Sequence, residues 1–595
     1  MSLLNLRQFL HKLREAEEIV DVYEEVDPCL EIAEIHRRVA AADGLALFFH
    51  RVKGSSFPVV TNLFGSKKRV SLAFQNRPEE TVASLVKLLT QEFPPKLSLL
   101  WKKRNTLKSL FALGTRHSRF APIKEKSIHP PDLEKLPFLK TWPLDGGHFV
   151  TLPLVYTEPP GGGPPNLGMY RIQRYGKDRA GLHFQIQKGG GFHYHQAEQM
   201  GQPLPVHIFI GGAPALILSA ITPLPENVPE ILIAGLMQGK KLSVSSCAES
   251  PYPLISECEF ALVGKSPPYQ RHPEGPFGDH YGYYSWTHDF PLFECEKIYH
   301  RKDAIYPATV VGKPRQEDYY IGDYLQEMLS PLFPVVMPGV KDLWSYGETG
   351  FHSLAAAVVR ERFYRECMSS AFRILGEGQL SLTKFLLVTD QPVNLRNFKE
   401  TLTTILERFR PETDLYIFAN LSLDTLDYTG PALNQGSRGI LLGVGEKIRD
   451  LPHEYHGKLP ANVKVATPFS PGCLVIELEG RGGDFSHLLS DPTFATWPLL
   501  ILVDQAAKTL KDSISFLWTV FTRFEPAADV YSQSQQVIRN HTSFKGPLLI
   551  DARMKPSYPP EVLCDPETEH KVTQRWSHYF PNGQEMGDSK NAHVV

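Results

Sequence analysis

The sequence predicts a multidomain α/β (α+β mixed) protein, with an N-terminal α/β segment, a central β-rich barrel or sandwich, and C-terminal duplicated α/β modules. Three observations predict this class. At 595 residues the chain is too long for one hydrophobic core. Short strand-like runs separated by Gly and Pro fill residues 136–315, which is typical of a β-rich domain. The remainder contains an internal repeat of a strand–helix–strand unit.

The composition is that of an ordinary globular protein, with 42% hydrophobic and 22% charged residues. The net charge of −2 argues against nucleic acid as a partner, because no basic excess is available to neutralise phosphates. Seven cysteines without a C-x-x-C pair favour a reducing cytoplasm over a disulfide frame or a zinc ribbon. No apolar run approaches the roughly 18 residues of a transmembrane span, so we expect a cytoplasmic protein with at most peripheral membrane contact.

Residues 1–115 form the predicted N-terminal α/β domain. Ser2 is a candidate N-cap for a first amphipathic helix, and Ile19–Val22 and Leu45–Phe49 have the apolar character of short strands. Residues 79–92 repeat apolar side chains at helical spacing and predict a second amphipathic helix.

The central domain is predicted over residues 116–318. Val206–Ile210 and Ala215–Ser219 are predicted to be short strands, and residues 230–238 a helix. The Pro-punctuated loop from Ser219 to Glu230 would leave main-chain carbonyls outside any sheet. Carbonyls and carboxylates together suit hard cations such as K⁺, Mg²⁺ or Mn²⁺. The alternative is a plain connection between a strand and a helix.

The C-terminal part contains two copies of one pattern, residues 385–418 and 499–533. Each copy has a buried strand followed by Asp-Gln, then a helix, then Arg-Phe-x-Pro and Tyr. Chance similarity is a weak alternative for so many matched residues. We therefore expect two related modules, an oligomerisation domain over 319–485 and a second module over 486–595 that ends in a loose polar tail. The matched pairs are Asp390 and Asp504, Arg408 and Arg523, Pro411 and Pro526, and Tyr416 and Tyr531.

The stretch Pro273–Ser285 carries the most distinctive chemistry of the chain. It holds two carboxylates, Glu274 and Asp279, separated by Gly-Pro-Phe-Gly. Pro and Gly exclude a helix between them, so a tight turn can aim both acids at one point. Paired carboxylates in unlike surroundings are how a site separates a charged carboxylate from a proton donor. The competing interpretation is a plain surface turn, but the aromatic residues that follow, through Trp286, favour a packed one.

Three further groups of residues are candidates for binding. Arg171 presents a planar fork suited to a carboxylate or phosphate, or to a structural salt bridge. The segment His183–Gly191 ends in Lys-Gly-Gly-Gly, where backbone amides and Lys188 can approach an anion, although neither standard nucleotide fingerprint is present. His193 and His195 lack the spacing of a zinc site, and packing or surface positions explain such a His pair better.

The order of these motifs resembles the UbiD family of prenylated-flavin-dependent decarboxylases. Asn-Leu-Gly-Met-Tyr-Arg at 166–171 is followed by a strand into Lys-Gly-Gly, then Gly-Ala-Pro-Ala, and then Glu-Gly-Pro-Phe-Gly-Asp-His-x-Gly-Tyr-Tyr from Glu274. The resemblance covers nearly the whole chain to near residue 560, and the duplicated C-terminal module resembles the longer, menaquinone-type branch. Further similar segments are the N-terminal 35 residues, 62–70, 303–309, 427–428 and 436–439.

The resemblance implies a split β-barrel at 116–318 that binds prenylated FMN, with Mn²⁺ or another divalent cation and K⁺ as a further candidate. Arg171, Glu274 and Asp279 match the catalytic trio, in which the Arg pairs with the first acid and the second acid delivers a proton. Residues that match the cofactor contacts are Met169, Tyr170, Arg171, His183, Phe184, Gln185, Lys188 and Gly189. Residues that match the divalent-metal ligands are Asn166 and Glu230, and the main chains of Leu167, Ser219, Ala220 and Thr222 match the monovalent-cation site.

The implied chemistry agrees with these residue types. Loss of CO₂ from an sp² carbon leaves a charge that no side chain can absorb, so a cofactor must be the electron sink while the protein supplies placement and a proton. Arg171 would orient the substrate carboxylate, with Glu274 holding the guanidinium. Asp279 must then be protonated near neutral pH, and we expect the aromatic residues at 281–286 to desolvate it and raise its pKa.

Two features depart from parts of the family. Some members place a His among the metal ligands; here Gln187 stands nearest, with His193 and His195 a few residues on, so the third ligand stays open. The second acid is Asp, as in quinone-pathway members, which favours a hydroxybenzoate- or hydroxynaphthoate-type substrate, with or without a polyprenyl tail, in menaquinone or ubiquinone biosynthesis. A flavin prenyltransferase is the implied cofactor supplier, and apolar α/β modules suggest a homo-oligomer.

Two other functions are compatible with part of this pattern. An ordinary FMN oxidoreductase would turn over NAD(P)H, but the acid–Arg–acid trio and the lack of a dinucleotide fingerprint count against it. A non-catalytic flavin-binding or assembly subunit would be expected to have lost the trio, which this chain retains. The sequence therefore predicts a carboxy-lyase that decarboxylates an aromatic carboxylic acid without net oxidation.

Overall fold

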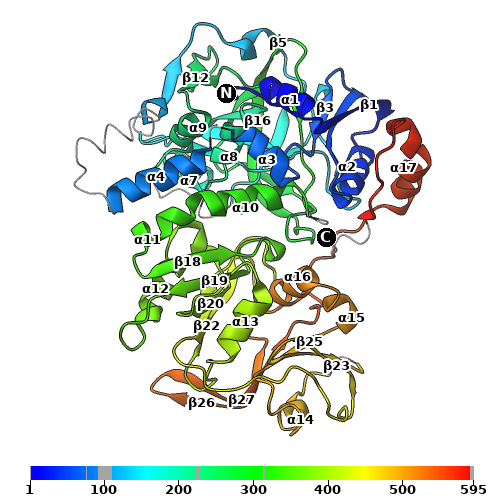
Figure 1. The fold of residues 1–595 in the computed structure, drawn as a ribbon. Coiled ribbons are helices and arrows are strands. Elements are labelled where there is room, and N and C mark those ends of the chain that lie inside the picture. Colours follow the sequence, from blue (N-terminus) through cyan, green and yellow to red (C-terminus); the bar gives the residue numbers. More distant parts are fainter. Residues whose placement is uncertain are drawn as a thin grey trace. The chain divides into compact units, whose positions relative to one another are not determined.

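The chain folds as two compact units in the computed structural model. Unit 1 comprises residues 1–328 and 560–593, and unit 2 comprises residues 329–559. Unit 1 therefore contains both ends of the sequence, as the blue and red elements of Figure 1 show. The residues that the structure describes are 2–75, 77–90, 110–185, 188–222, 228–312, 315–480 and 482–589.

The N-terminal part of unit 1 is a small sheet with helices packed on it. Its elements are α1 (Leu6–Glu15), β1 (Ile19–Val26), α2 (Glu31–Ala41), β2 (Ala46–Val52), β3 (Val59–Thr61), α3 (Lys67–Ala73), α4 (Pro78–Thr90) and, from later in the chain, β17 (Tyr306–Pro307). The expected first strands and second helix correspond to β1, β2 and α4, while residues 91 and 92 of the expected helix lie outside the described ranges. The N-cap of α1 is Asn5 instead of the expected Ser2, because the Asn5 side chain accepts a hydrogen bond from Gln8 N.

The central part of unit 1 is one antiparallel sheet. In path order its strands are β6 (Phe149–Val150), β9 (Ile172–Arg174), β10 (Arg179–Leu182), β16 (His288–His300), β14 (Phe260–Ser266), β11 (Leu204–Ile210), β7 (Pro153–Thr157) and β8 (Asn166–Gly168), with β15 (Arg271–Glu274) and β5 (Lys126–Ile128) paired to β16. The path runs from β6 to β8 without pairing these two ends in the described residues. The expected split barrel is thus present as an open, curled half-barrel.

Short helices and a second small sheet complete this part of unit 1. They are β4 (Thr115–His117), α7 (Gly189–Gln199), α8 (Pro214–Ser219), α9 (Glu230–Gln238), β12 (Leu242–Ser245), β13 (Leu254–Ile255) and α10 (Glu317–Leu329), with one-turn 3₁₀ helices at Leu110–Ala112, Pro122–Lys124 and Leu133–Lys135. The expected strand at Ala215–Ser219 is wrong, because this segment is the buried helix α8. Pro214 pre-sets the first turn of α8, and so short an apolar run has no periodicity that separates helix from strand.

The C-terminal segment is ordered, contrary to the expected loose tail. The helix α17 (Pro566–Tyr579) is capped by Asp565 and packs against α2 and β1. Glu31 of α2 receives the charges of Lys571 and Arg575 and the Tyr579 hydroxyl. A buried carboxylate with three partners therefore fixes this segment to the N-terminal sheet.

Unit 2 contains two five-stranded sheets of the same topology. The first, which we call repeat A (340–443), comprises β18 (Val340–Ser345), β19 (Leu354–Val359), α12 (Glu366–Leu375), β20 (Phe385–Thr389), α13 (Phe398–Leu406), β21 (Leu415–Ser422) and β22 (Gln435–Gly443). The second, repeat B (463–551), comprises β23 (Val463–Ser470), β24 (Cys473–Leu478), α14 (Ser486–Leu489), β25 (Leu499–Val503), α15 (Ala506–Thr509), α16 (Ser513–Arg523), β26 (Val530–Ile538) and β27 (His541–Asp551). Short helices at Ser330–Leu332, α11 (Phe333–Val336), Gly347–Thr349 and Gly378–Leu382 complete the unit.

Repeat B begins earlier than the sequence repeat indicates. Strands β23 and β24 belong to its sheet, although they fall in the range 319–485 expected for the first module. The visible sequence similarity is confined to the strand–helix–strand core, where packing residues recur. The flanking hairpins share only their backbone pairing, which leaves no residue pattern to match.

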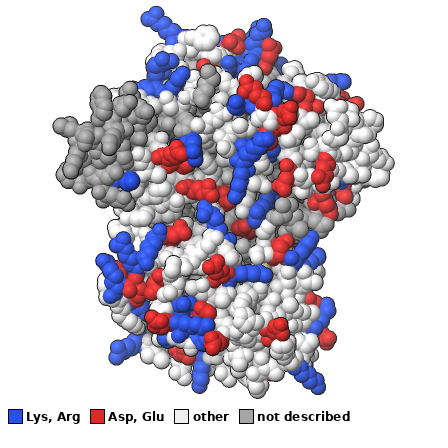
Figure 2. Space-filling view, viewed as in Figure 1, with Lys and Arg blue, Asp and Glu red and all other residues white. Residues whose placement is uncertain are grey.

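The surface and the helices agree with the composition. On the face drawn in Figure 2, Lys and Arg side chains are interspersed with Asp and Glu side chains on each unit. Within the described ranges, none of the helices combines the length and the apolarity needed to cross a bilayer.

Candidate active site

Arg171 is the centre of the candidate site. It lies between β8 and β9 and is 9% exposed. Its Nε and Nη2 donate to Glu274 Oε1 and Oε2 at 2.7 and 2.9 Å, which is a bidentate ion pair. Its Nη1 donates to Asp279 Oδ2. The structure therefore brings the three residues of the expected trio together around one guanidinium.

The turn between the two acids is held by its neighbours. Gly275 has φ +96°, and a Cβ at Gly278 would lie 2.2 Å from the Trp142 ring, so glycine is required at both positions. Asp145 Oδ1 accepts from Gly278 N at 2.8 Å. The Ser285 hydroxyl accepts from Arg171 Nη2 at 3.0 Å. These contacts confirm the expected packed turn.

Glu274 is ionised in this environment. It is fully buried at the end of β15, and its Oε2 lies 3.1 Å from His183 Nδ1. Burial acts to raise the pKa of Glu274, but the charge of Arg171 and the contact with His183 outweigh it and lower the pKa to about 2. Burial and Arg171 lower the pKa of His183, so a neutral imidazole donates from Nδ1 to the carboxylate.

The expected rise in the pKa of Asp279 is wrong for the ligand-free site. Burial does act to raise this pKa, but the hydrogen bonds from His280 and the charge of Arg171 hold it well below its ordinary range. Asp279 Oδ1 accepts from the His280 amide and lies 2.7 Å from His280 Nδ1. These contacts to the ionised form outweigh desolvation, so Asp279 is a carboxylate at neutral pH.

The expected cofactor residues line one side of this centre. Met169 and Tyr170 precede Arg171, and the segment 183–185 follows β10. The Tyr170 and Phe184 rings meet edge to face with centroids 5.2 Å apart. The Tyr170 hydroxyl accepts from Gly190 N at 3.2 Å, and burial raises its pKa to about 12. Gln185 Nε2 lies 3.3 Å from His183 Nε2.

The Gly-Gly-Gly stretch opens helix α7, where a strand running into it was expected. Lys188 is the N-cap but makes no side-chain cap, so backbone N–H groups are available at this helix start. A Cβ at Gly189 would lie 2.2 Å from Asn166 Oδ1, so only glycine permits this close approach. An uncapped glycine-rich helix start beside polar side chains fits a flavin phosphate.

The two expected metal residues lie next to each other. Glu230 is the first residue of α9, and its Oε2 accepts from Leu167 N at 2.9 Å, beside Asn166. Burial raises the pKa of Glu230. This pair of oxygen ligands suits a hard divalent cation. Among the described residues, no group of three or more His, Cys, Asp or Glu side chains is placed to hold a metal ion.

The candidates for a third ligand separate in the structure. His193 Nδ1 lies 2.9 Å from Thr157 Oγ1, and Thr157 is the register partner of Asn166. His195 is exposed and contacts Gln199. Gln187 lies outside the described residues. Of the two histidines, His193 is therefore the one on the side of Asn166.

The monovalent-cation residues are described only in part. Ser219 ends α8, and Ala220 and Thr222 follow it in the next turn. The Ser219 and Thr222 hydroxyls donate to carbonyls of α8. Residues 223–227 of the Pro-punctuated loop lie outside the described ranges. The structure thus leaves the cation site a prediction.

Sequence analysis missed two positioning residues. Asp145 collects the amides of Thr141, Trp142 and Gly278, and burial raises its pKa to about 6. Ser285 binds both Arg171 and the amide of Phe277. Asp145 lies more than a hundred residues from the two acids, so no local motif signals its role. A cavity of about 610 Å³ near Phe57 contains none of the site residues, so the ion-pair chemistry locates the site and cavity size does not.

The chain matches three family models in succession. They describe the N-terminal, Rift-related and C-terminal domains of 3-octaprenyl-4-hydroxybenzoate carboxy-lyase (UbiD), over residues 10–89, 115–314 and 319–443. The chain is 54% identical over 577 residues to a 4-hydroxybenzoate decarboxylase protein of Chlamydia pneumoniae, covering 97% of this chain and 98% of the relative. It is 52% identical over 581 residues to an uncharacterized protein of Chlamydia caviae, covering 98% and 100%.

Solved structures share the fold at lower identity. The vanillic acid decarboxylase of Sedimentibacter hydroxybenzoicus in its closed form superposes with a TM-score of 0.66 at 24% identity, covering 77% of this chain and 95% of that chain. The UbiD-class enzyme HmfF of Pelotomaculum thermopropionicum, solved with FMN, gives 0.61 at 23% identity, covering 77% and 97%. The curated relatives match over nearly their whole length, and the acid–Arg–acid centre lies within the matched Rift-related domain. The chain therefore belongs to the UbiD family of carboxy-lyases.

Proposed function

We propose that this chain removes CO₂, without net oxidation, from a hydroxybenzoate- or hydroxynaphthoate-type acid with prenylated FMN as its cofactor. One observation carries the proposal: a buried Arg171 is held bidentately by Glu274 and also contacts Asp279. An orienting cation and a second acid in one place are what decarboxylation requires of the protein. The 4-hydroxybenzoate decarboxylase name of the relative at 54% identity supports this substrate class.

Arg171 is the residue that positions the substrate. Glu274 occupies Nε and Nη2, which fixes the plane of the guanidinium and turns Nη1 toward Asp279. A substrate carboxylate that binds Arg171 replaces part of the contact with Asp279. The Phe277 ring, whose centroid is 4.8 Å from the guanidinium carbon, packs on the guanidinium and keeps water from it.

Asp279 is the proton donor in this proposal. It is ionised in the ligand-free site, so it takes up a proton when the substrate carboxylate reaches Arg171 and removes the cation that held it ionised. His280 Nδ1, 2.7 Å from Asp279 Oδ1, is placed to hold that carboxyl in one orientation. The proton then passes to the carbon from which CO₂ has left.

The cofactor side of the site supplies the remaining chemistry. When bound, prenylated FMN provides the electron sink that no side chain can offer. The helix start at Gly189 would hold its phosphate, with Tyr170, Phe184 and Gln185 against the ring. Asn166 and Glu230 would hold Mn²⁺ next to that phosphate, with His193 as the third ligand.

The wider biological assignment rests on family resemblance. A flavin prenyltransferase would supply the cofactor, and K⁺ would bind near Ser219. The substrate would belong to menaquinone or ubiquinone biosynthesis, with or without a polyprenyl tail. We place the protein in the cytoplasm, as a homo-oligomer.

Asp279→Asn tests the proposal. The variant and the wild type are produced anaerobically with a flavin prenyltransferase and Mn²⁺, and the bound cofactor is identified by absorbance and mass. We expect both to bind prenylated FMN, with CO₂ release from hydroxybenzoates and hydroxynaphthoates lost only in Asp279→Asn. The control is Asp289→Asn, an exposed carboxylate on β16, which should keep full activity. Plain FMN with NAD(P)H oxidation, or an active Asp279→Asn, would contradict the proposal.

A further inference from the structure

The two repeats of unit 2 have the same strand order and the same pairing directions. In repeat A the order is β18-β19-β20-β22-β21, and in repeat B it is β23-β24-β25-β27-β26. In both, the first and last pairs are antiparallel and the two inner pairs are parallel. Helices α13 and α16 begin with a side-chain N-cap at equivalent positions, Asn397 and Asp512. The repeats are thus two copies of one fold.

The repeats bury the same face against each other. One apolar cluster contains residues of β20, β22 and α13 together with residues of β25, β27 and α16. A small cavity at its centre is lined by residues at equivalent strand positions. The equivalent pairs are Phe385 and Leu499, Leu387 and Ile501, and Leu441 and Ile550. An interface in which each partner presents the same positions is self-complementary.

The polar contacts at the edge of this interface are reciprocal. The loop after α13 of repeat A meets the last strand of repeat B, where Pro411 O accepts from Phe544 N at 3.4 Å and Glu412 O lies 3.2 Å from His541 Nε2. The loop after α16 of repeat B meets the last strand of repeat A, where Ala527 N donates to Ser437 Oγ at 2.9 Å. Exchange of the same loop-to-strand contact in both directions is the signature of a two-fold axis.

We propose that unit 2 is a covalently fused pseudo-dimer, in which repeat B occupies the surface that repeat A would otherwise use to pair with a second copy of itself. The C-terminal family model ends at residue 443, so it matches repeat A and not repeat B. The two solved structures align over 95% and 97% of their own chains but over 77% of this one. This face of repeat A is therefore filled within the chain, and any homo-oligomer of this protein uses other surfaces.

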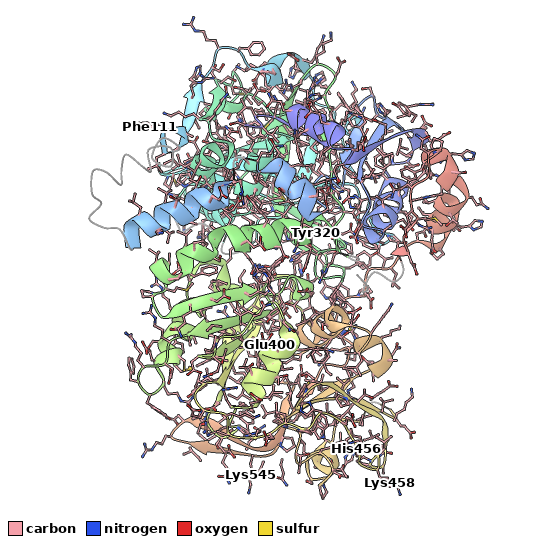
Figure 3. All side chains as sticks on the ribbon, viewed as in Figure 1. Phe111, Tyr320, Glu400, His456, Lys458 and Lys545 are labelled. Atoms are coloured by element: carbon pink, nitrogen blue, oxygen red, sulfur yellow. The ribbon has the colours of Figure 1, made fainter. Side chains whose placement is uncertain are left out.

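The test removes repeat B and asks whether repeat A then pairs. A variant replaces residues 453–558 with a flexible linker and keeps the segment of unit 1 that follows. The excised part starts in the exposed connector that carries His456 and Lys458 (Figure 3). We expect light scattering to show particles with twice as many chains as full-length protein at the same concentration. An unchanged number of chains in a folded variant would overturn the proposal.

A cysteine pair identifies the surface that pairs. Strand register makes Gln435 of repeat A the equivalent of Phe544 of repeat B, so Gln435 of one copy should face Glu412 of another. With both residues changed to Cys, the shortened variant should form an inter-chain disulfide, whereas the full-length chain should not. The matched control combines Gln435→Cys with Glu400→Cys, because Glu400 points to solvent from α13 (Figure 3). An inter-chain disulfide between positions 412 and 435 in the full-length protein would overturn the proposal.

A second measurement decides the matter if the shortened variant does not fold. In the full-length chain, Cys at Glu412 and His541 and Cys at Ser437 and Ala527 sample the two reciprocal contacts. We expect both pairs to form intra-chain disulfides under the same oxidation, visible as faster migration on a non-reducing gel. If only one pair forms in folded protein, the contacts are not reciprocal and the pseudo-dimer is rejected.

Discussion

Glu274→Gln is expected to destabilise unit 1 by about 3 kcal/mol at pH 7. Glu274 is fully buried and accepts both hydrogen bonds of the bidentate pair with Arg171. Its pKa falls from 4.5 to about 2, and a difference of about 2.5 in pKa corresponds to about 3 kcal/mol. The Gln amide would also set a donor against the donors of Arg171 or His183. Asp279 still pairs with Arg171, so we take the lower end of the roughly 3–5 kcal/mol for removing one partner of a buried ion pair.

The sign of the pH dependence is fixed by the lowered pKa. A carboxylate whose pKa is depressed by folding contributes stability above its unfolded pKa and loses it as pH falls toward the folded one. The unfolded value is 4.5 and the folded value about 2, so the contribution of Glu274 is complete at pH 7. The difference between wild type and Glu274→Gln should shrink from about 3 kcal/mol at pH 7 to about 1 kcal/mol at pH 3.

The measurement must separate the two units. Urea unfolding followed by hydrogen-exchange mass spectrometry does so, because peptides of unit 1 and of unit 2 are read individually. We expect unit 1 peptides of Glu274→Gln to open at lower urea while unit 2 peptides do not change. Glu294→Gln on β16 is the control, because within the described structure Glu294 makes no ion pair. A loss below about 1 kcal/mol at pH 7, or equal losses at pH 7 and pH 3, would refute the reasoning.

Three further predictions follow from single contacts. Gly189→Ala places a methyl group 2.2 Å from Asn166 Oδ1 and should weaken FMN binding, measured by absorbance titration, without changing the urea midpoint of unit 2. Ser285→Ala removes an acceptor for Arg171 and should cost unit 1 about 1–3 kcal/mol in urea unfolding; an unchanged midpoint would exclude that role. Glu31→Gln breaks the anchor of α17, so peptides over 566–579 should exchange faster in native buffer, whereas Glu17→Gln should leave them unchanged.

The two-acid turn was predictable because its constraints are local. Pro and Gly between Glu274 and Asp279 exclude a helix, and the structure shows why each glycine is needed. The partner of the acids, Arg171, lies 103 residues away from Glu274. No local pattern links residues so far apart, so only the family resemblance joined them. Asp145 and Ser285, which complete the turn through backbone amides, carry no motif and were missed.

Other errors share one physical cause. Ala215–Ser219 is apolar throughout and buried on every side, so its periodicity gave no signal and α8 was taken for a strand. The polar helix α17 is held by charges that converge on Glu31, and sequence polarity alone suggested a loose tail. In both cases tertiary contacts decided the structure, and local propensity did not.

The ionisation of Asp279 shows why the direction of a pKa cannot be taken from burial alone. Arg171 carries one positive charge against the two carboxylates of Glu274 and Asp279, so this trio is already net negative. A substrate carboxylate brings a third negative charge to the same guanidinium. At about 5 Å and an effective dielectric constant of about 20, each new pair of like charges costs about 3 kcal/mol, or roughly 2 in pKa. Glu274 keeps its bidentate pair, so Asp279 is the group that takes the proton. Substrate binding would thus create the protonated donor that reaction requires, and the ligand-free site does not need to hold one.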